Sequence, residues 1–104
     1  MAKLGCRLSI SDLVAPTIQE TKRLVKEATG TDSNVNAMCM DVSNRALITE
    51  CARKSEQVFG PVDIIINNAG VVQARLLTEA DDRKIHQTMV INGESHIWII
   101  KEFL

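Results

Sequence analysis

One stretch, residues 62–70, constrains the fold more than any other part of the chain. It begins with a nearly unbroken apolar run, Val62–Ile66, and ends in two amides, a small residue and a glycine. A short β-branched run is typical of a strand buried on both faces of a parallel sheet. Its carboxyl end would lie where open α/β folds bind ligands. Two interpretations remain open for the polar end. It is either a ligand site or a strand-to-loop turn in which an Asn takes unusual dihedrals and Gly70 supplies a positive φ.

The rest of the chain alternates between strand and helix patterns. Period-2 alternation predicts strands at 6–12 and 35–42, and helical spacing of apolar residues predicts helices at 16–28, 44–59 and from Thr78 to the end. With the apolar run, the order is strand, helix, strand, helix, strand, helix, which implies a parallel sheet with helical crossovers. We therefore expect an α/β fold with three parallel strands, in one domain spanning residues 1–104.

Local signals predict how the later helices begin and which side they bury. Ser43 is expected to cap the helix at 44–59, and residues 78–81 resemble a capping box with Asp in place of Glu. Gly93 weakens the last helix locally and predicts a kink there. One stripe of this helix is predicted to face inward: Ile85, Met89, Asn92, His96, Ile99 and Phe103.

Charge and cysteine content exclude several classes of function. The formal net charge is −1 and no basic run is present, so nucleic acid is not an expected partner. Three cysteines without metal-ligand spacing predict a reducing compartment and no disulfide. Neither a signal peptide nor an apolar run long enough to span a bilayer is recognisable. We expect a cytoplasmic protein, or one at the endoplasmic reticulum or lipid droplets if an anchor precedes these residues.

Polar residues stand at the carboxyl ends of the predicted strands. Asp12 ends the first strand, where a dinucleotide-binding fold places its ribose-binding carboxylate. An Asp that turns the strand into a loop, or that caps the next helix, would give the same sequence pattern. Asp41 ends the second and is equally compatible with an Asx turn. Asn92 on the last helix could be a site residue or a core amide bonded between helices. We interpret His96 as a packing histidine.

These positions together resemble the short-chain dehydrogenase/reductase family. Asn67-Asn68-Ala69-Gly70 after a hydrophobic strand resembles the family's "NNAG" element, and Asp12, Asp41-Val42 and Asn92 match its order and spacing over nearly the whole chain. The resemblance implies a partial Rossmann-like, doubly wound sheet. It also implies NAD(P)-dependent interconversion of a secondary alcohol and a ketone. An unrelated α/β module would have to match at all these positions by accident.

The resemblance also implies a role for each residue. Asp12 would pair with the adenosine ribose hydroxyls, which favours NAD because a carboxylate repels the extra phosphate of NADP. Asp41 and Val42 would lie against the adenine. Residues 67–70 would lie beside the cofactor, where small side chains let the ribose and nicotinamide approach. Asn92 would be the catalytic asparagine that holds a water leading to an active-site lysine.

The end of the chain hints at the substrate. Residues 96–104, which follow Asn92, resemble the branch of the family that acts on retinoids and 17-beta-hydroxysteroids. A small lipid-like alcohol or ketone is therefore the expected substrate of the parent enzyme.

Two parts of the family pattern are missing from the 104 residues. The five glycines stand apart and form no glycine-rich turn for the pyrophosphate, and without a tyrosine there is no Tyr-x-x-x-Lys to act as general acid. The resemblance begins just before the second strand of the order 3-2-1-4-5-6, so the first strand, which lies between the second and the fourth, is missing. Strands 6–12 and 62–66 would then either pair directly with each other or leave two open edges. We expect the middle part of a dehydrogenase, truncated at both ends, inactive itself and binding nucleotide weakly or not at all. The alternative is a non-catalytic short isoform that associates with full-length relatives, as a homo- or hetero-oligomer, through residues 85–104.

Overall fold

The computed structural model describes residues 1–104 and contains a two-stranded parallel sheet. Strand β1 (Leu8–Asp12) pairs with β2 (Val35–Cys39), and the last residues of the two strands, Asp12 and Cys39, lie opposite each other. The N–H of Met40 donates to the Asp12 carbonyl at 2.9 Å and prolongs the pairing. Both carboxyl ends therefore lie at one edge of the sheet. The two strands were predicted correctly, with ends a few residues too long.

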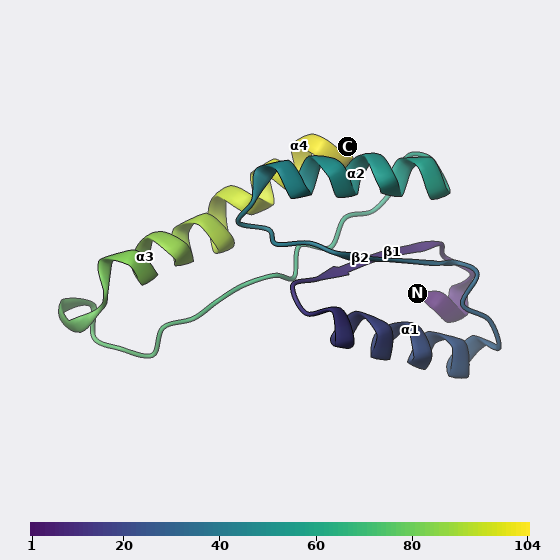
Figure 1. Ribbon diagram of the computed structural model, residues 1–104, viewed down its shortest axis with the longest axis horizontal. Coiled ribbons are helices and arrows are strands. Elements are labelled where there is room, and N and C mark those ends of the chain that lie inside the picture. Colours follow the sequence, from purple (N-terminus) through teal and green to yellow (C-terminus); the bar gives the residue numbers. More distant parts are fainter.

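Helices α1 (Ala15–Thr29) and α2 (Arg45–Phe59) cover opposite faces of this sheet, with α1 below it and α2 above it in Figure 1. Gly30 ends α1 with a φ of 80°, a conformation that glycine adopts at little cost. The predicted cap of α2 was wrong by one residue. Asn44 is the N-cap and accepts hydrogen bonds from the N–H groups of Ala46 and Leu47, whereas Ser43 bonds to Asp41.

The predicted third strand at 62–66 does not form. No backbone hydrogen bond joins this segment to a neighbour, and the sheet has two strands only. Ile65 still packs against the core, while Ile64 and Ile66 are 64 % and 70 % exposed. Only Val62 and Ile65 of the segment are half-buried, so it is not buried on both faces as predicted. A strand needs a partner for its backbone groups, and the doubly wound order leaves none here beside it.

The last third of the chain is a helix interrupted by a π-helical turn. After a short 3-10 turn η2 (Leu77–Glu79), the helix consists of α3 (Asp82–Met89), the π segment η3 (Val90–Glu94) and α4 (Ser95–Phe103). The predicted irregularity at Gly93 falls inside η3. The predicted capping box was wrong: Asp81, not Thr78, accepts from the N–H groups of Arg83 and Lys84.

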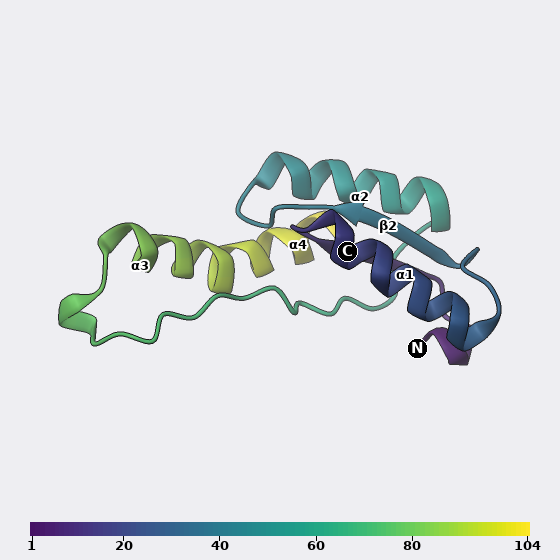
Figure 2. The ribbon, with the colours of Figure 1, turned by 60° about the horizontal axis from the view of Figure 1, so that its bottom comes forward.

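The core is small and lies between the sheet, α2 and α4. Its buried cluster is Met38, Met40, Ile48, Cys51 and Ile99. Only 10 of the 104 residues are buried, and the radius of gyration is 15.5 Å, against about 13 Å for a compact chain of this length. In both views α3 projects away from the sheet (Figures 1 and 2).

This projection explains why the predicted inward stripe of the last helix fails at its start. Met89 is 64 % exposed and Asn92 is exposed, His96 is half-buried, and Ile99 is fully within the core. The stripe has the right spacing, but before α4 reaches α2 only the extended segment after Gly70 lies beside it, through the bonds of Asn92 to Val71. No helix of the protein combines the length and apolarity needed to cross a membrane.

Candidate functional site

Two aspartates lie at the common carboxyl edge of the sheet, and each forms a local turn. The Asp12 carboxylate accepts the N–H of Val14 at 2.9 Å, and Asp41 accepts the N–H and the hydroxyl of Ser43 at 2.9 and 2.7 Å. Both are therefore Asx turns, one of the two interpretations that the sequence left open. In each case a single carboxylate oxygen, Oδ1, makes these bonds, and Oδ2 stays free to accept from hydroxyl or amine groups.

The segment Asn67-Asn68-Ala69-Gly70 is not a tight turn. No residue other than glycine has a positive φ, and the positive-φ glycines are Gly5, Gly30 and Gly60, so Gly70 does not supply one. The turn interpretation of this segment is therefore wrong. Asn68, Ala69 and Gly70 are all exposed and leave their backbone accessible at the surface.

Asn92 fastens this segment to the last helix. Its Oδ1 accepts the N–H of Val71 at 2.8 Å and its Nδ2 donates to the Val71 carbonyl at 2.7 Å. A β-carbon on Gly70 would lie 3.5 Å from the same Oδ1. The alternative interpretation required Asn92 to be a buried amide bonded between two helices. It is instead exposed, and it bonds to an extended segment. It connects the π segment to the residue that follows Gly70.

His96 contacts the same segment one residue upstream of Gly70. Its Nε2 lies 3.1 Å from the Ala69 carbonyl oxygen. The interpretation of His96 as a packing residue missed this contact. The signal that could have indicated it was its position on the stripe of Asn92, four residues later, since residues at this spacing are neighbours on a helix.

These residues fit the adenosine half of a dinucleotide. Two carboxylates with free oxygens at one sheet edge can accept from the ribose hydroxyls and the adenine amine. Val42, beside Asp41, is half-buried against the core and presents a fixed apolar side chain. The Oδ1 atom of Asn67 is buried without a partner, which leaves an acceptor for a donor outside these residues. For the pyrophosphate, the isolated glycines of this chain offer no matching loop.

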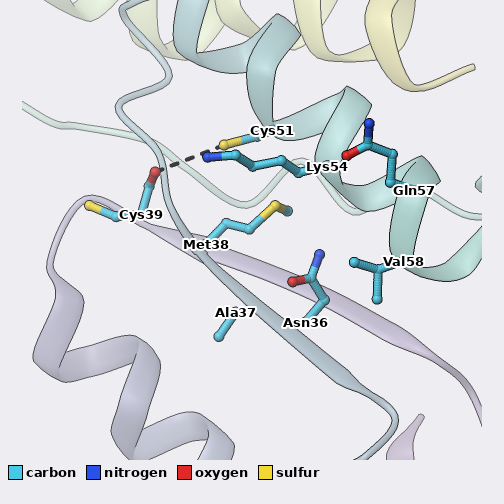
Figure 3. A pocket seen from close by; sticks show the side chains of 8 residues that line it. All are labelled: Asn36, Ala37, Met38, Cys39, Cys51, Lys54, Gln57 and Val58. Carbon is cyan, nitrogen blue, oxygen red and sulfur yellow. Dashed lines mark hydrogen bonds between the residues drawn. The ribbon is translucent and has the colours of Figure 1, made fainter.

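A separate hollow lies between β2 and α2 and has a volume of about 420 Å³. None of the predicted site residues lines it. Figure 3 shows the Cys51 thiol directed at the Cys39 carbonyl, 3.8 Å away, while the Cys39 sulfur points elsewhere. Burial raises the pKa of the Cys51 thiol and so disfavours the reactive thiolate. The Cys51 thiol is therefore not activated as a nucleophile.

The chain is similar to a known protein family and to several known proteins. Residues 1–104 match the short chain dehydrogenase family. The chain is 36 % identical to short-chain dehydrogenase/reductase family 16C member 6 of Bos taurus, and 35 % identical to estradiol 17-beta-dehydrogenase 11 of Homo sapiens. It is also 36 % identical, over 86 % of its length, to retinol dehydrogenase 10-B of Danio rerio. The first two matches cover 99 % of this chain, and the three cover 32 %, 33 % and 30 % of those proteins, respectively.

Solved structures show the same fold. An alcohol dehydrogenase from Thermococcus sibiricus, complexed with 5-hydroxy-NADP, superposes with a TM-score of 0.90 at 22 % identity. The match covers 98 % of this chain and 43 % of that one. This chain therefore has the fold of one part of that longer chain. The protein is a member of the short-chain dehydrogenase/reductase family and spans about a third of the length of the curated relatives that it matches.

Proposed function

We propose that these residues form the adenosine-binding edge and the asparagine-bearing helix of an NAD-dependent dehydrogenase that interconverts a secondary alcohol and a ketone. The observation that carries the proposal is the pair of carboxylates, Asp12 and Asp41, at one sheet edge with a free oxygen each. Family membership supports NAD(P) as the cofactor. Bound NAD would supply the hydride acceptor for the alcohol.

The residues of this chain have binding and positioning roles in this proposal. Asp12 receives the ribose hydroxyls, and Asp41 with Val42 borders the adenine. The exposed backbone of Ala69 and Gly70 lines the path toward the nicotinamide. Asn92 is the candidate for the catalytic asparagine, and its amide is already committed to Val71. Each of these two atoms can make one further hydrogen bond, so the exposed Asn92 amide can still hold a water while it is bonded to Val71.

A lipid-like substrate is the finer part of the proposal. Two of the relatives are named as retinol dehydrogenase 10-B and estradiol 17-beta-dehydrogenase 11, which are similar to this chain over 86 % and 99 % of its length. The resemblance of residues 96–104 to that branch points the same way. We therefore propose a retinoid or steroid alcohol, or the matching carbonyl compound, for the complete enzyme.

The chain itself should not turn over, because its 104 residues contain no tyrosine to transfer the proton. The test is the rate of NADH consumption by the pure chain with a steroid ketone or retinal. We expect a rate equal to that of a blank without protein. Turnover well above the blank would contradict the proposed inactivity.

The preference for NAD is tested by the variant Asp12→Asn, whose amide oxygen can still accept the N–H of Val14. The Asp12 carboxylate repels the extra phosphate of NADPH. Because two like charges near a protein surface repel each other by about 1 kcal/mol or more, loss of the Asp12 charge should shift the ratio of NADH to NADPH affinity toward NADPH by at least about fivefold. Asp82→Asn, the same change at an exposed residue of α3, is the control and should leave the ratio unchanged. An unchanged ratio in Asp12→Asn would refute the assignment of Asp12.

A second candidate function is association with full-length relatives through residues 85–104. The favouring observation is an apolar surface on this helix: Met89, Ile97, Ile100 and Leu104 are 64 %, 66 %, 49 % and 74 % exposed. Co-purification from cells should then recover a full-length dehydrogenase, and Ile97→Asp should abolish the recovery. Ile64→Asp, at a site that is 64 % exposed but outside the helix, is the matched control. Failure to recover a relative would exclude this candidate.

The intact mass of the endogenous protein separates the two candidates. It can be captured with an antibody against α2 (Arg45–Phe59). A mass near 11.5 kDa would favour the interaction module. A mass well over twice as large would favour a complete dehydrogenase of which these residues are one part.

A further inference from the structure

Two polar side chains of the last helix lie four positions apart, one in the π segment η3 and one just after it. Residues at this spacing are neighbours on a helix surface. Asn92 is in the middle of η3 (Val90–Glu94), and His96 follows at the start of α4. Both reach the extended segment that runs beside this helix.

Together they hold the backbone on both sides of Gly70. His96 Nε2 is 3.1 Å from the Ala69 carbonyl oxygen, and Asn92 bonds to both backbone groups of Val71 at 2.8 and 2.7 Å. Ala69, Gly70 and Val71 are exposed, so burial does not fix them. Glycine has more backbone freedom to lose than any other residue. A hold on one side alone would leave the Gly70 dihedrals free to move Ala69.

The contact identifies which ring nitrogen of His96 carries a hydrogen. A carbonyl oxygen can only accept a hydrogen bond, so His96 Nε2 must carry the hydrogen. In the neutral side chain, Nδ1 is then the nitrogen without a hydrogen. This tautomer is a property that a histidine acting only through packing would not need.

We propose that His96 is a positioning residue that, together with Asn92, fixes the Ala69–Gly70 peptide in the orientation that receives the nicotinamide-bearing half of the cofactor. The inference rests on the proposed function, since it assigns a role within the same binding edge. Its physical basis is preorganisation: a backbone that is already ordered loses less entropy when the ligand binds. His96 would therefore affect affinity without touching the cofactor.

The test uses three variants of the full 104-residue chain, isotopically labelled for NMR. His96→Phe keeps a ring of similar size and removes the N–H. His96→Gln restores an N–H donor of similar reach. His86→Phe is the control, because it replaces an exposed histidine of α3 by phenylalanine. Long-range proton–nitrogen correlation reports the tautomer of His96. The carbonyl shift of Ala69 and the amide nitrogen shift of Gly70 report the hydrogen bond, and titration with NADH reports affinity.

We expect the Nε2–H tautomer, altered Ala69 and Gly70 shifts in His96→Phe, and about a two- to tenfold weaker NADH midpoint, the range for one hydrogen bond. His96→Gln should restore most of the affinity, and His86→Phe should match the unmodified chain. A mixture of tautomers, or unchanged shifts in His96→Phe, would overturn the contact. An unchanged NADH midpoint in His96→Phe would overturn the positioning role. If the unmodified chain binds no NADH, the proposed function fails and the positioning role with it, while the tautomer and the two shifts still decide the contact.

Discussion

Removal of the Asn92 amide should loosen the segment that follows residues 62–70. In Asn92→Leu, two hydrogen bonds to Val71, of 2.8 and 2.7 Å, are lost at once. Each is worth about 0.5–1.5 kcal/mol, and the lower half of this range applies because water can replace the lost partner at an exposed site. The total of about 1–2 kcal/mol corresponds to roughly 5- to 30-fold faster hydrogen exchange of the Val71 amide, at a factor of ten per 1.4 kcal/mol.

The assay is native-state amide exchange followed by NMR. Gln87→Leu makes the same change of an amide to a leucine at an exposed position of α3, and it should leave the exchange of Val71 unchanged. The amide of Leu104, which bonds to Ile100 at the far end of the helix, should not respond to either variant. An unaltered exchange rate of Val71 in Asn92→Leu would refute the role of Asn92 as the fastener.

Three further predictions concern stability and reactivity. Ile48 is completely buried, so Ile48→Ala should lower the free energy of unfolding by about 2–5 kcal/mol in urea denaturation, whereas Ile97→Ala, at a residue that is 66 % exposed, should change it by less than about 0.5 kcal/mol. Similar losses in both would contradict the placement of the core. Gly30→Ala should destabilise by about 1–2 kcal/mol, because alanine is strained at a φ of 80°. Mass spectrometry of the alkylated native chain should find the exposed Cys39 modified before Cys51, whose thiol pKa burial raises, and equal rates would refute the burial of Cys51.

Local sequence patterns were sufficient for the elements that pair or pack with sequence neighbours. The alternation around Asp12 and Cys39 predicted β1 and β2, and Gly30 and Gly60 marked the ends of α1 and α2 correctly. The caps at Asn44 and Asp81 were missed because several neighbouring residues could have capped each helix. Which one does so depends on where the backbone first becomes helical.

Non-local features were beyond the sequence patterns. The apolar run at 62–66 has the composition of a strand, but strand formation depends on a partner that no local pattern supplies. The inward stripe of the last helix failed at Met89 because α3 extends past the elements that could cover it. The hold of Asn92 on Val71 and the contact of His96 with Ala69 join residues 21 and 27 positions apart. Only the fold brings them together.

The most direct test of the account is an NMR titration of the full chain with NAD. Binding at the proposed edge should shift the amides next to Asp12, Asp41 and Gly70 first, with a weak midpoint, and Asp12→Asn should reduce the shifts beside β1. Shifts confined to the hollow between β2 and α2, or no shifts at any concentration, would contradict the assignment of this edge as a cofactor site.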